Sequence, residues 1–246
     1  MTKDNNIATG TIAPLQNVSL VAKALKKVMD RREHLPGIIA LYGYSGLGKT
    51  LAAIYAANKY RAYYVEAKEY WTRKAFLSAI LQQMGIKPEK TISLMADQVA
   101  EELAISGKPL IIDEFDHIIN RKLVEMVRSI YEGSHGSILI IGEENIPTML
   151  QKQSERFHGR VLSWVQAQEP DLADTKLIRD LYIKDVVVKD DLLKAVLKAV
   201  NGSIRRIATN LEKVREFALE QGLEEIGLSE WGEMEFDVGQ APRRRR

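Results

Sequence analysis

The sequence predicts an α/β fold with a parallel five-stranded sheet sandwiched by helices, followed by a small all-α domain. Short apolar runs alternate with segments of helical periodicity between residues 37 and 166, as in a parallel sheet covered on both faces. A glycine-rich turn follows the first apolar run. After Pro170 the periodicity becomes helical, and no further strand is expected.

The first elements show both patterns. Residues 17–32 form a predicted amphipathic helix, because apolar residues recur there at helical spacing. The unbroken apolar run 37–42 predicts a strand buried on both faces. The segment 49–59, which follows the glycine-rich turn, has the composition of a helix.

The later elements continue the alternation. Further strands are predicted over 62–65, 110–113, 137–141 and 161–166. Further helices are predicted over 72–84, 93–105, 121–131 and 146–152. Gly85 and Gly107 are expected to end two of these helices. Beyond Pro170, helices are predicted over 171–182, 190–200 and 203–221.

The composition is that of an ordinary globular protein, with 46% apolar and 28% charged residues among 246. We expect a cytoplasmic protein, since the chain has no long apolar run and no signal-peptide pattern. The absence of cysteine excludes disulfides and thiolate metal sites. The net charge is +2, and four of the positive charges are the arginines at residues 243–246. Any affinity for nucleic acid must therefore come from a local patch, or from this tail acting as a phosphate-binding arm.

The glycine-rich turn carries a phosphate-binding motif, G-x-x-x-x-G-K-[ST], between a predicted strand and a predicted helix. Glycines let successive backbone N–H groups point at phosphate oxygens, and the helix adds the positive end of its dipole. We expect Lys49 to reach the β- and γ-phosphates of ATP and the Thr50 hydroxyl to ligate Mg²⁺. The predicted nucleotide-binding residues of this loop are Gly43, Tyr44, Ser45, Gly46, Leu47, Gly48, Lys49 and Thr50.

A second motif is the apolar strand 110–113, which ends in two carboxylates. Burying such a strand end costs solvation unless the acids face a cation or a polar cleft. We expect Asp113 to bind Mg²⁺ and Glu114 to polarise the attacking water. Asp116 follows closely, and no catalytic role is assigned to it.

These motifs together resemble AAA+ ATPases. The resemblance implies a nucleotide-binding domain over 17–168 and a helical lid over 169–228, with a flexible N-terminal tail over 1–16 and a disordered C-terminal tail over 229–246. It also implies a water-orienting polar residue, sensor 1, after the strand 137–141. Glu143 matches by position, and Asn145 is the alternative.

Three arginines fit other positions of AAA+ proteins. Gly202-Ser203-Ile204-Arg205 resembles the sensor 2 motif, in which Arg205 would contact the γ-phosphate. Arg156 and Arg160 precede the fifth strand, where AAA+ proteins carry an arginine finger that enters the site of a neighbouring subunit. We favour Arg156. A finger used in this way implies a homo-oligomer, either a ring or a helical filament.

Within AAA+ proteins, the segments 142–145 and 155–157 are similar to the transposition regulators related to the phage Mu B protein, TnsC and TniB. This resemblance implies an ATP-dependent, nonspecific DNA-binding ATPase that assembles on target DNA and recruits and activates a transposase. The alternative is a helicase-loader or initiator-type AAA+ ATPase of DNA replication. A third hypothesis is a signalling or defence NTPase without a nucleic-acid partner.

The most basic local stretch covers residues 59–74, with Tyr70 and Trp71 between its charges. In the transposition regulators, the segment after the second strand follows the phosphate backbone of double-stranded DNA. Salt-sensitive contacts without sequence preference are therefore expected. The candidate DNA-binding residues are Lys68, Arg73 and Lys74, with Lys87, Lys90 and Thr91 as a second set.

Overall fold

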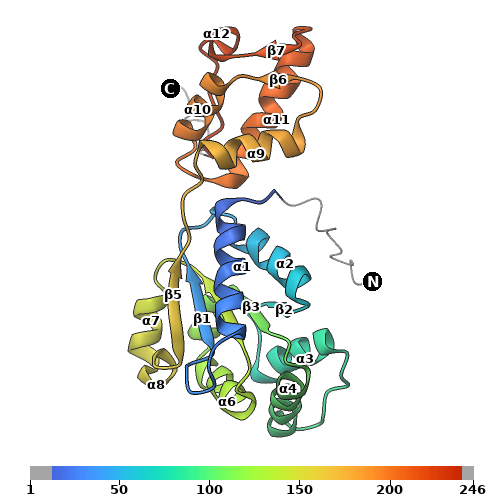
Figure 1. Ribbon diagram of the computed structural model, residues 1–246, viewed down its shortest axis with the longest axis vertical. Helices are drawn as coiled ribbons and strands as arrows, with labels where there is room; N and C mark the ends of the chain where they lie inside the picture. The colour runs from blue at the N-terminus through green and yellow to red at the C-terminus, as the bar shows by residue number, and fades with distance from the viewer. Residues whose placement is uncertain (1–12, 240–246) are drawn as a thin grey trace. The chain divides into compact units, whose positions relative to one another are not determined.

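The computed structural model describes residues 13–239 of the chain (Figure 1). Its contacts divide the chain into two compact units. The larger unit comprises residues 17–44 and 49–167. The smaller unit contains residues 168–239 and, by its contacts, also residues 13–16 and 45–48. None of the helices between residues 13 and 239 is both long and apolar enough to cross a membrane.

The larger unit is built on a parallel sheet of five strands in the order β2-β3-β4-β1-β5. This arrangement confirms the predicted fold class. The sheet has β1 at its interior, so the turn after β1 lies between the ends of β4 and β5. Its strands are β1 (Ile38–Tyr42), β2 (Tyr63–Glu66), β3 (Leu110–Asp113), β4 (Ile138–Gly142) and β5 (Val161–Gln166).

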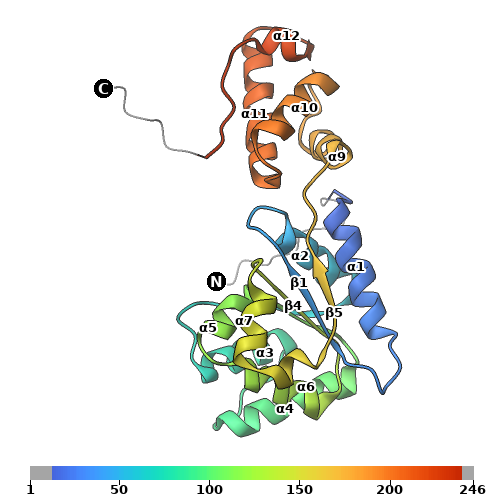
Figure 2. The same ribbon diagram turned by 90° about the vertical axis from the view of Figure 1, so that its left-hand side faces the viewer.

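Helices cover both faces of this sheet (Figure 2). They are α1 (Gln16–Met29), α2 (Lys49–Tyr60), α3 (Arg73–Met84), α4 (Ile92–Ser106), α5 (Phe115–Asn120), α6 (Val124–Ser134), α7 (Ile146–Gln153) and α8 (Glu155–His158). Ile112 and Ile140 face a core completed by α3, α4 and α6. Ile111 and Ile141 are equally buried, and alternation along the strands turns them to the other face, on which α2 packs. The hydroxyl of Tyr60 joins α2 to α1 by donating to the carbonyl of Ala22 at 2.9 Å.

Helices α5, α6 and α8 of the larger unit differ from the predictions. The helix expected over 121–131 begins at Val124, because Lys122 has a left-handed backbone with φ of 56°. The six-residue helix α5 and the four-residue helix α8 were not predicted, since both are too short to show helical periodicity. Gly85 and Gly107 end α3 and α4 in the left-handed conformation, as predicted.

The smaller unit is mainly helical. Its elements are α9 (Leu172–Tyr182), β6 (Val187–Val188), α10 (Asp190–Ala199), α11 (Ile204–Glu220), β7 (Glu225–Ile226) and α12 (Leu228–Trp231). The predicted helical character of this part is confirmed, and the short parallel pair of β6 and β7 is an addition that was not predicted. Two-residue strands are too short to produce a period-two pattern, so they could not be predicted from the sequence.

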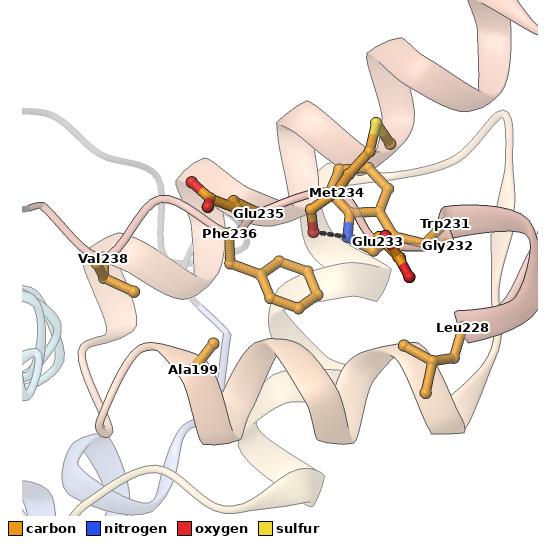
Figure 3. A pocket seen from close by; sticks show the side chains of 9 residues that line it. All are labelled: Ala199, Leu228, Trp231, Gly232, Glu233, Met234, Glu235, Phe236 and Val238. Atoms are coloured by element: carbon orange, nitrogen blue, oxygen red, sulfur yellow. Dashed lines mark hydrogen bonds between the residues drawn. The ribbon is translucent and has the colours of Figure 1, made fainter. Parts of the chain in front are cut away.

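The chain after Gly227 is ordered by Trp231, which is only 2% exposed. Its indole Nε1–H donates to the carbonyl of Met234 at 2.9 Å, and its ring stacks on Phe236 with centroids 5.5 Å apart (Figure 3). The buried side chain of Asn210 forms hydrogen bonds of 2.8 and 2.7 Å with the carbonyl and N–H of Asp237. Residues 228–231 therefore form a helix, and the segment that follows is held by these hydrogen bonds. A tail had been expected from residue 229. The arginines at residues 243–246 lie outside the described residues.

Candidate nucleotide-binding site

The turn between β1 and α2 has the backbone that the phosphate-binding motif requires. Gly46 and Gly48 have φ of 89° and 78°, in the left-handed region that favours glycine. The loop leads directly into α2, whose first residue is Lys49. The first N–H groups of a helix have no partner within it, so this end of α2 offers donors and a positive dipole to an anion.

Lys49 lies beside the loop that it follows. Its Nζ donates to the carbonyl oxygens of Gly43 and Tyr44, both at 2.7 Å. Burial lowers the pKa of Lys49, while the carboxylates of Glu114, Asp113, Asp116 and Glu143 act in the opposite direction. The candidate phosphate-binding cation therefore faces four acidic side chains from the ends of β3 and β4.

Asp113 is the last residue of β3 and is only 2% exposed. Its Oδ1 accepts the N–H of Glu114 at 2.9 Å, and its Oδ2 accepts the hydroxyl of Tyr64 at 3.0 Å. Burial raises the pKa of Asp113, and hydrogen bonds from Glu114, Thr50 and Tyr64 oppose this effect. The side chains of Thr50 and Asp113, the two residues expected to bind Mg²⁺, therefore interact with each other.

Tyr64 is a site residue that the sequence analysis missed. It lies on β2 opposite Ile111, two residues before Asp113 on the neighbouring strand, and so on the same face of the sheet. Burial is the main cause that raises the pKa of the Tyr64 hydroxyl well above its usual range, and the negative charge of Asp113 raises it further. The hydroxyl therefore stays protonated and donates. Because β2 carries two adjacent tyrosines, a hydroxyl in this strand did not by itself distinguish Tyr64 from Tyr63.

Glu114 stands at the junction of β3 and α5 in a left-handed conformation, with φ of 53° and ψ of 45°. A non-glycine residue in this region costs free energy, and such residues are common at functional sites. Burial raises the pKa of Glu114, with further increases from Asp113 and Asp116, whereas His117 and Lys49 lower it. A carboxylate with a raised pKa is better suited to accept a proton from water.

The two candidates for sensor 1 differ in their contacts. Glu143 is the first residue after β4, and its N–H donates to Oδ2 of Asp116 at 2.9 Å. Asn145 precedes α7, and its side-chain nitrogen lies 3.5 Å from Oε1 of Glu144. The structure thus brings Glu143 near Lys49 and the end of β3, whereas the contact of the Asn145 amide is with its neighbour in sequence.

The arginine-finger candidates lie on and just after α8. Arg160 forms an exposed ion pair with Glu132 at 3.0 Å. Arg156 is exposed in α8, and it contributes to the lowered pKa of Glu125, after the Ser154 hydroxyl and Arg128. Both arginines are at the surface, where a neighbouring subunit could be reached. Arg205 is exposed at the second position of α11 in the smaller unit, and the Ser203 hydroxyl caps that helix.

The candidate DNA-binding residues lie at two turns of the larger unit. Lys68 forms an ion pair with Glu66 at 2.5 Å, while Arg73 and Lys74 are exposed in the first turn of α3. Tyr70 is 75% exposed, whereas Trp71 packs against Phe76 in the core. Lys87 and Lys90 are exposed in the turn before α4, where the Thr91 side chain accepts the N–H of Leu94 and caps the helix. Thr91 therefore has a structural role whether or not it contacts DNA.

The donor set fits a magnesium nucleotide. A hydroxyl and a carboxylate oxygen are ligands that Mg²⁺ prefers, and Mg²⁺ sites of this kind use few protein ligands together with phosphate oxygens. The buried carboxylate of Asp113 has a raised pKa, which a nearby dication would offset. The glycine backbone at residues 46 and 48 and the ammonium of Lys49 supply the donors for the phosphates.

The sheet order, the phosphate-binding loop and the acidic end of β3 define a P-loop nucleotide-binding domain. Residues 31–150 match a family model described as an AAA domain. This part of the chain is therefore an AAA domain, the module of P-loop AAA+ ATPases. No curated protein matches the chain.

Solved structures show the same fold at low sequence identity. The Aeropyrum pernix ORC2 protein in its ADP form superposes with a TM-score of 0.69 at 15% identity, over 91% of this chain and 68% of that protein. The Aeropyrum pernix ORC1 protein in complex with DNA gives 0.62 at 16% identity, over 85% of this chain and 61% of that protein. Domain III of the Thermotoga maritima replication initiation protein DnaA gives 0.58 at 16% identity, over 94% and 95% of the two chains. The chain thus spans about two thirds of the ORC proteins and nearly all of the DnaA domain.

Proposed function

We propose that this protein is an AAA+ ATPase that binds ATP with Mg²⁺ and hydrolyses it to ADP and phosphate. The observation that carries this proposal is the position of Lys49 beside Asp113 and Glu114, at the carboxyl ends of β1 and β3, the two parallel strands that flank β4. Lys49 would bind the β- and γ-phosphates, and Thr50 and Asp113 would hold Mg²⁺. Bound Mg²⁺ would neutralise charge on the phosphate oxygens during transfer.

Glu114 would act as the base that orients and deprotonates the attacking water. It stands at the end of β3 in a left-handed backbone conformation, and its raised pKa suits proton acceptance. Glu143 would provide the sensor 1 contact, with Asn145 as the alternative. Arg205 would act as sensor 2, and Arg156 would supply the finger to a neighbouring subunit of a homo-oligomer.

Lys49→Ala tests nucleotide binding. The variant loses the ammonium next to the phosphates, so we expect titration calorimetry with ATP and Mg²⁺ to show heat for the unaltered protein and none for the variant. Lys59→Ala is the matched control, because Lys59 lies at the exposed end of the same helix. Equal ATP binding by Lys49→Ala and the unaltered protein would refute the assignment of the loop.

For the biological role, we propose an ATPase that acts on double-stranded DNA in replication, as an initiator or helicase loader. The support is the likeness in fold to a protein named for replication initiation and to an ORC1 protein solved with DNA. The exposed basic residues Arg73 and Lys74 are candidates for phosphate contacts.

The second candidate is a transposition regulator that assembles on target DNA and recruits a transposase. It is supported by the similarity of residues 142–145 and 155–157 to that family. The two candidates differ in their assemblies. A regulator is expected to coat DNA as filaments with ATP, whereas a loader is expected to form discrete rings with a helicase.

Electron microscopy of the protein with ATP, with and without duplex DNA, distinguishes the replication role from the transposition role. Discrete rings that do not extend along DNA support the replication role. Continuous DNA-coating filaments support the transposition role and contradict the first. If neither assembly forms while ATP is bound, the protein is better described as a stand-alone NTPase.

A further inference from the structure

Asp116 is the acidic residue at this site to which the nucleotide-binding motifs give no role. It is half-buried in the first turn of α5, two residues after Glu114. A carboxylate in a partly buried position requires compensation for its lost hydration, which a hydrogen-bond donor supplies.

The donor that compensates the Asp116 carboxylate belongs to the end of another strand, β4. Oδ2 of Asp116 accepts the N–H of Glu143 at 2.9 Å. Glu143 is the residue at which the chain leaves β4, and the segment continues through Asn145 into α7. One charge-assisted hydrogen bond therefore joins the start of α5, directly after the candidate base, to the segment that carries both candidates for sensor 1.

The backbone next to this bond leaves room for the carboxylate. Gly142, the last residue of β4, is buried. A Cβ atom placed on it would come closer than 3.0 Å to Oδ2 of Asp116 and also to Cδ1 of Ile146. Real Cβ atoms essentially never make contacts this short. Glycine at 142 is therefore a condition for the bond between Asp116 and Glu143 in its observed geometry.

We infer that Asp116 is a positioning residue that fixes the segment from Glu143 to Asn145 relative to Glu114. This inference rests on the proposed ATPase function. It means that the base and the water-orienting residue, which come from different strands, keep one mutual arrangement. A displacement of about 1 Å at a catalytic group can reduce the rate on the order of a hundredfold, so a single hydrogen bond here can matter for turnover.

Two substitutions of Asp116 distinguish a role in positioning from a role of its negative charge. We expect Asp116→Ala to lower kcat by about tenfold to a hundredfold while the KM for ATP stays within about twofold, because the phosphate-binding loop is unchanged. Asp116→Asn keeps an oxygen acceptor and should retain most of the rate. An Asn variant as slow as the Ala variant would show that charge, not positioning, matters. Asp97→Ala, an exposed aspartate on α4, is the control.

Gly142→Ala provides an independent approach to the same bond. Its added methyl group should displace Asp116 or the segment after β4 and lower kcat by a similar factor. Because both changes disrupt one contact, the double variant with Asp116→Ala should be little slower than the slower single variant. Independent, multiplicative losses in the double variant would contradict the inference.

A measurement without turnover keeps this inference separate from the ATPase proposal. Amide hydrogen exchange of Glu143 in the nucleotide-free protein should accelerate at least about tenfold in Asp116→Ala and little in Asp116→Asn, since only the first loses the acceptor. Unchanged exchange in Asp116→Ala would overturn the inference even if ATP hydrolysis were established. Lack of ATP hydrolysis by the unaltered protein, with the expected exchange, would instead overturn the proposed function. Thermal unfolding of each variant shows whether the fold is intact.

Discussion

The ring of Phe115 stacks on the ring of Phe157, with centroids 5.7 Å apart and an interplanar angle of 29°. Phe115 directly follows Glu114, and Phe157 directly follows Arg156. Both rings are completely buried. The candidate base and the candidate arginine finger are thus each one residue away from the same aromatic contact, although they lie more than 40 residues apart in the sequence.

Phe157→Ala should destabilise the protein by about 3–5 kcal/mol, because it leaves a cavity and removes the partner of Phe115. Chemical denaturation, followed by circular dichroism, measures the loss. Tyr70→Ala removes an aromatic ring that is 75% exposed and should change stability by less than about 0.5 kcal/mol. A Phe157 variant as stable as the Tyr70 variant would show that the stacked pair contributes little.

Glu114→Gln should keep ATP binding and lower kcat by about 10²–10⁴-fold, since the amide cannot accept the proton from water. Calorimetry measures binding, and phosphate release measures turnover. The neighbouring Asp116→Asn variant serves as a comparison, because it also removes one negative charge near Lys49. Normal turnover in Glu114→Gln would mean that another group is the base.

Tyr64→Phe should raise the Mg²⁺ concentration that hydrolysis requires, without preventing folding. The change removes the hydroxyl that donates to Oδ2 of Asp113 and leaves the ring in place. Loss of a partner that orients a metal ligand typically costs 10–100-fold in metal affinity, so the Mg²⁺ concentration for half-maximal rate should rise by about tenfold. An unchanged Mg²⁺ titration would contradict the role of Tyr64.

Arg156→Ala should lower turnover without weakening ATP binding if the arginine acts in a neighbouring subunit. The sharper measurement is a mixture of Arg156→Ala and Glu114→Gln proteins. A site that combines Glu114 of the Arg156→Ala protein with Arg156 of a neighbouring Glu114→Gln protein has both groups, so mixed oligomers should hydrolyse ATP faster than either variant alone. A mixture no faster than the sum of its parts would exclude Arg156 as a finger in trans.

Arg73→Ala and Lys74→Ala should each reduce the salt dependence of DNA binding, lowering the slope of log K against log salt by about 1. Lys68→Ala should have a smaller effect, because Lys68 already pairs with Glu66. Lys152→Ala on α7 is an exposed control. Fluorescence anisotropy with duplex DNA at several salt concentrations measures the slopes. Equal slopes for all four variants and the unaltered protein would exclude this segment as the interface.

The strands of the main sheet could be predicted because burial on both faces makes them short apolar runs, as in 110–113 and 137–141. Helix α5 could not, since it has six residues and begins after the left-handed Glu114. Local motifs likewise predicted Lys49, Thr50, Asp113 and Glu114 as candidate site residues. The contacts of Tyr64 with Asp113 and of Asp116 with Glu143 depend on which strands are neighbours, and this order is not encoded in any local pattern.

The ammonium of Lys49 has two acceptors within the protein, the carbonyls of Gly43 and Tyr44. An arriving triphosphate must compete with these carbonyls, so the measured affinity for ATP reflects an exchange of partners and not the full strength of the new ion pair.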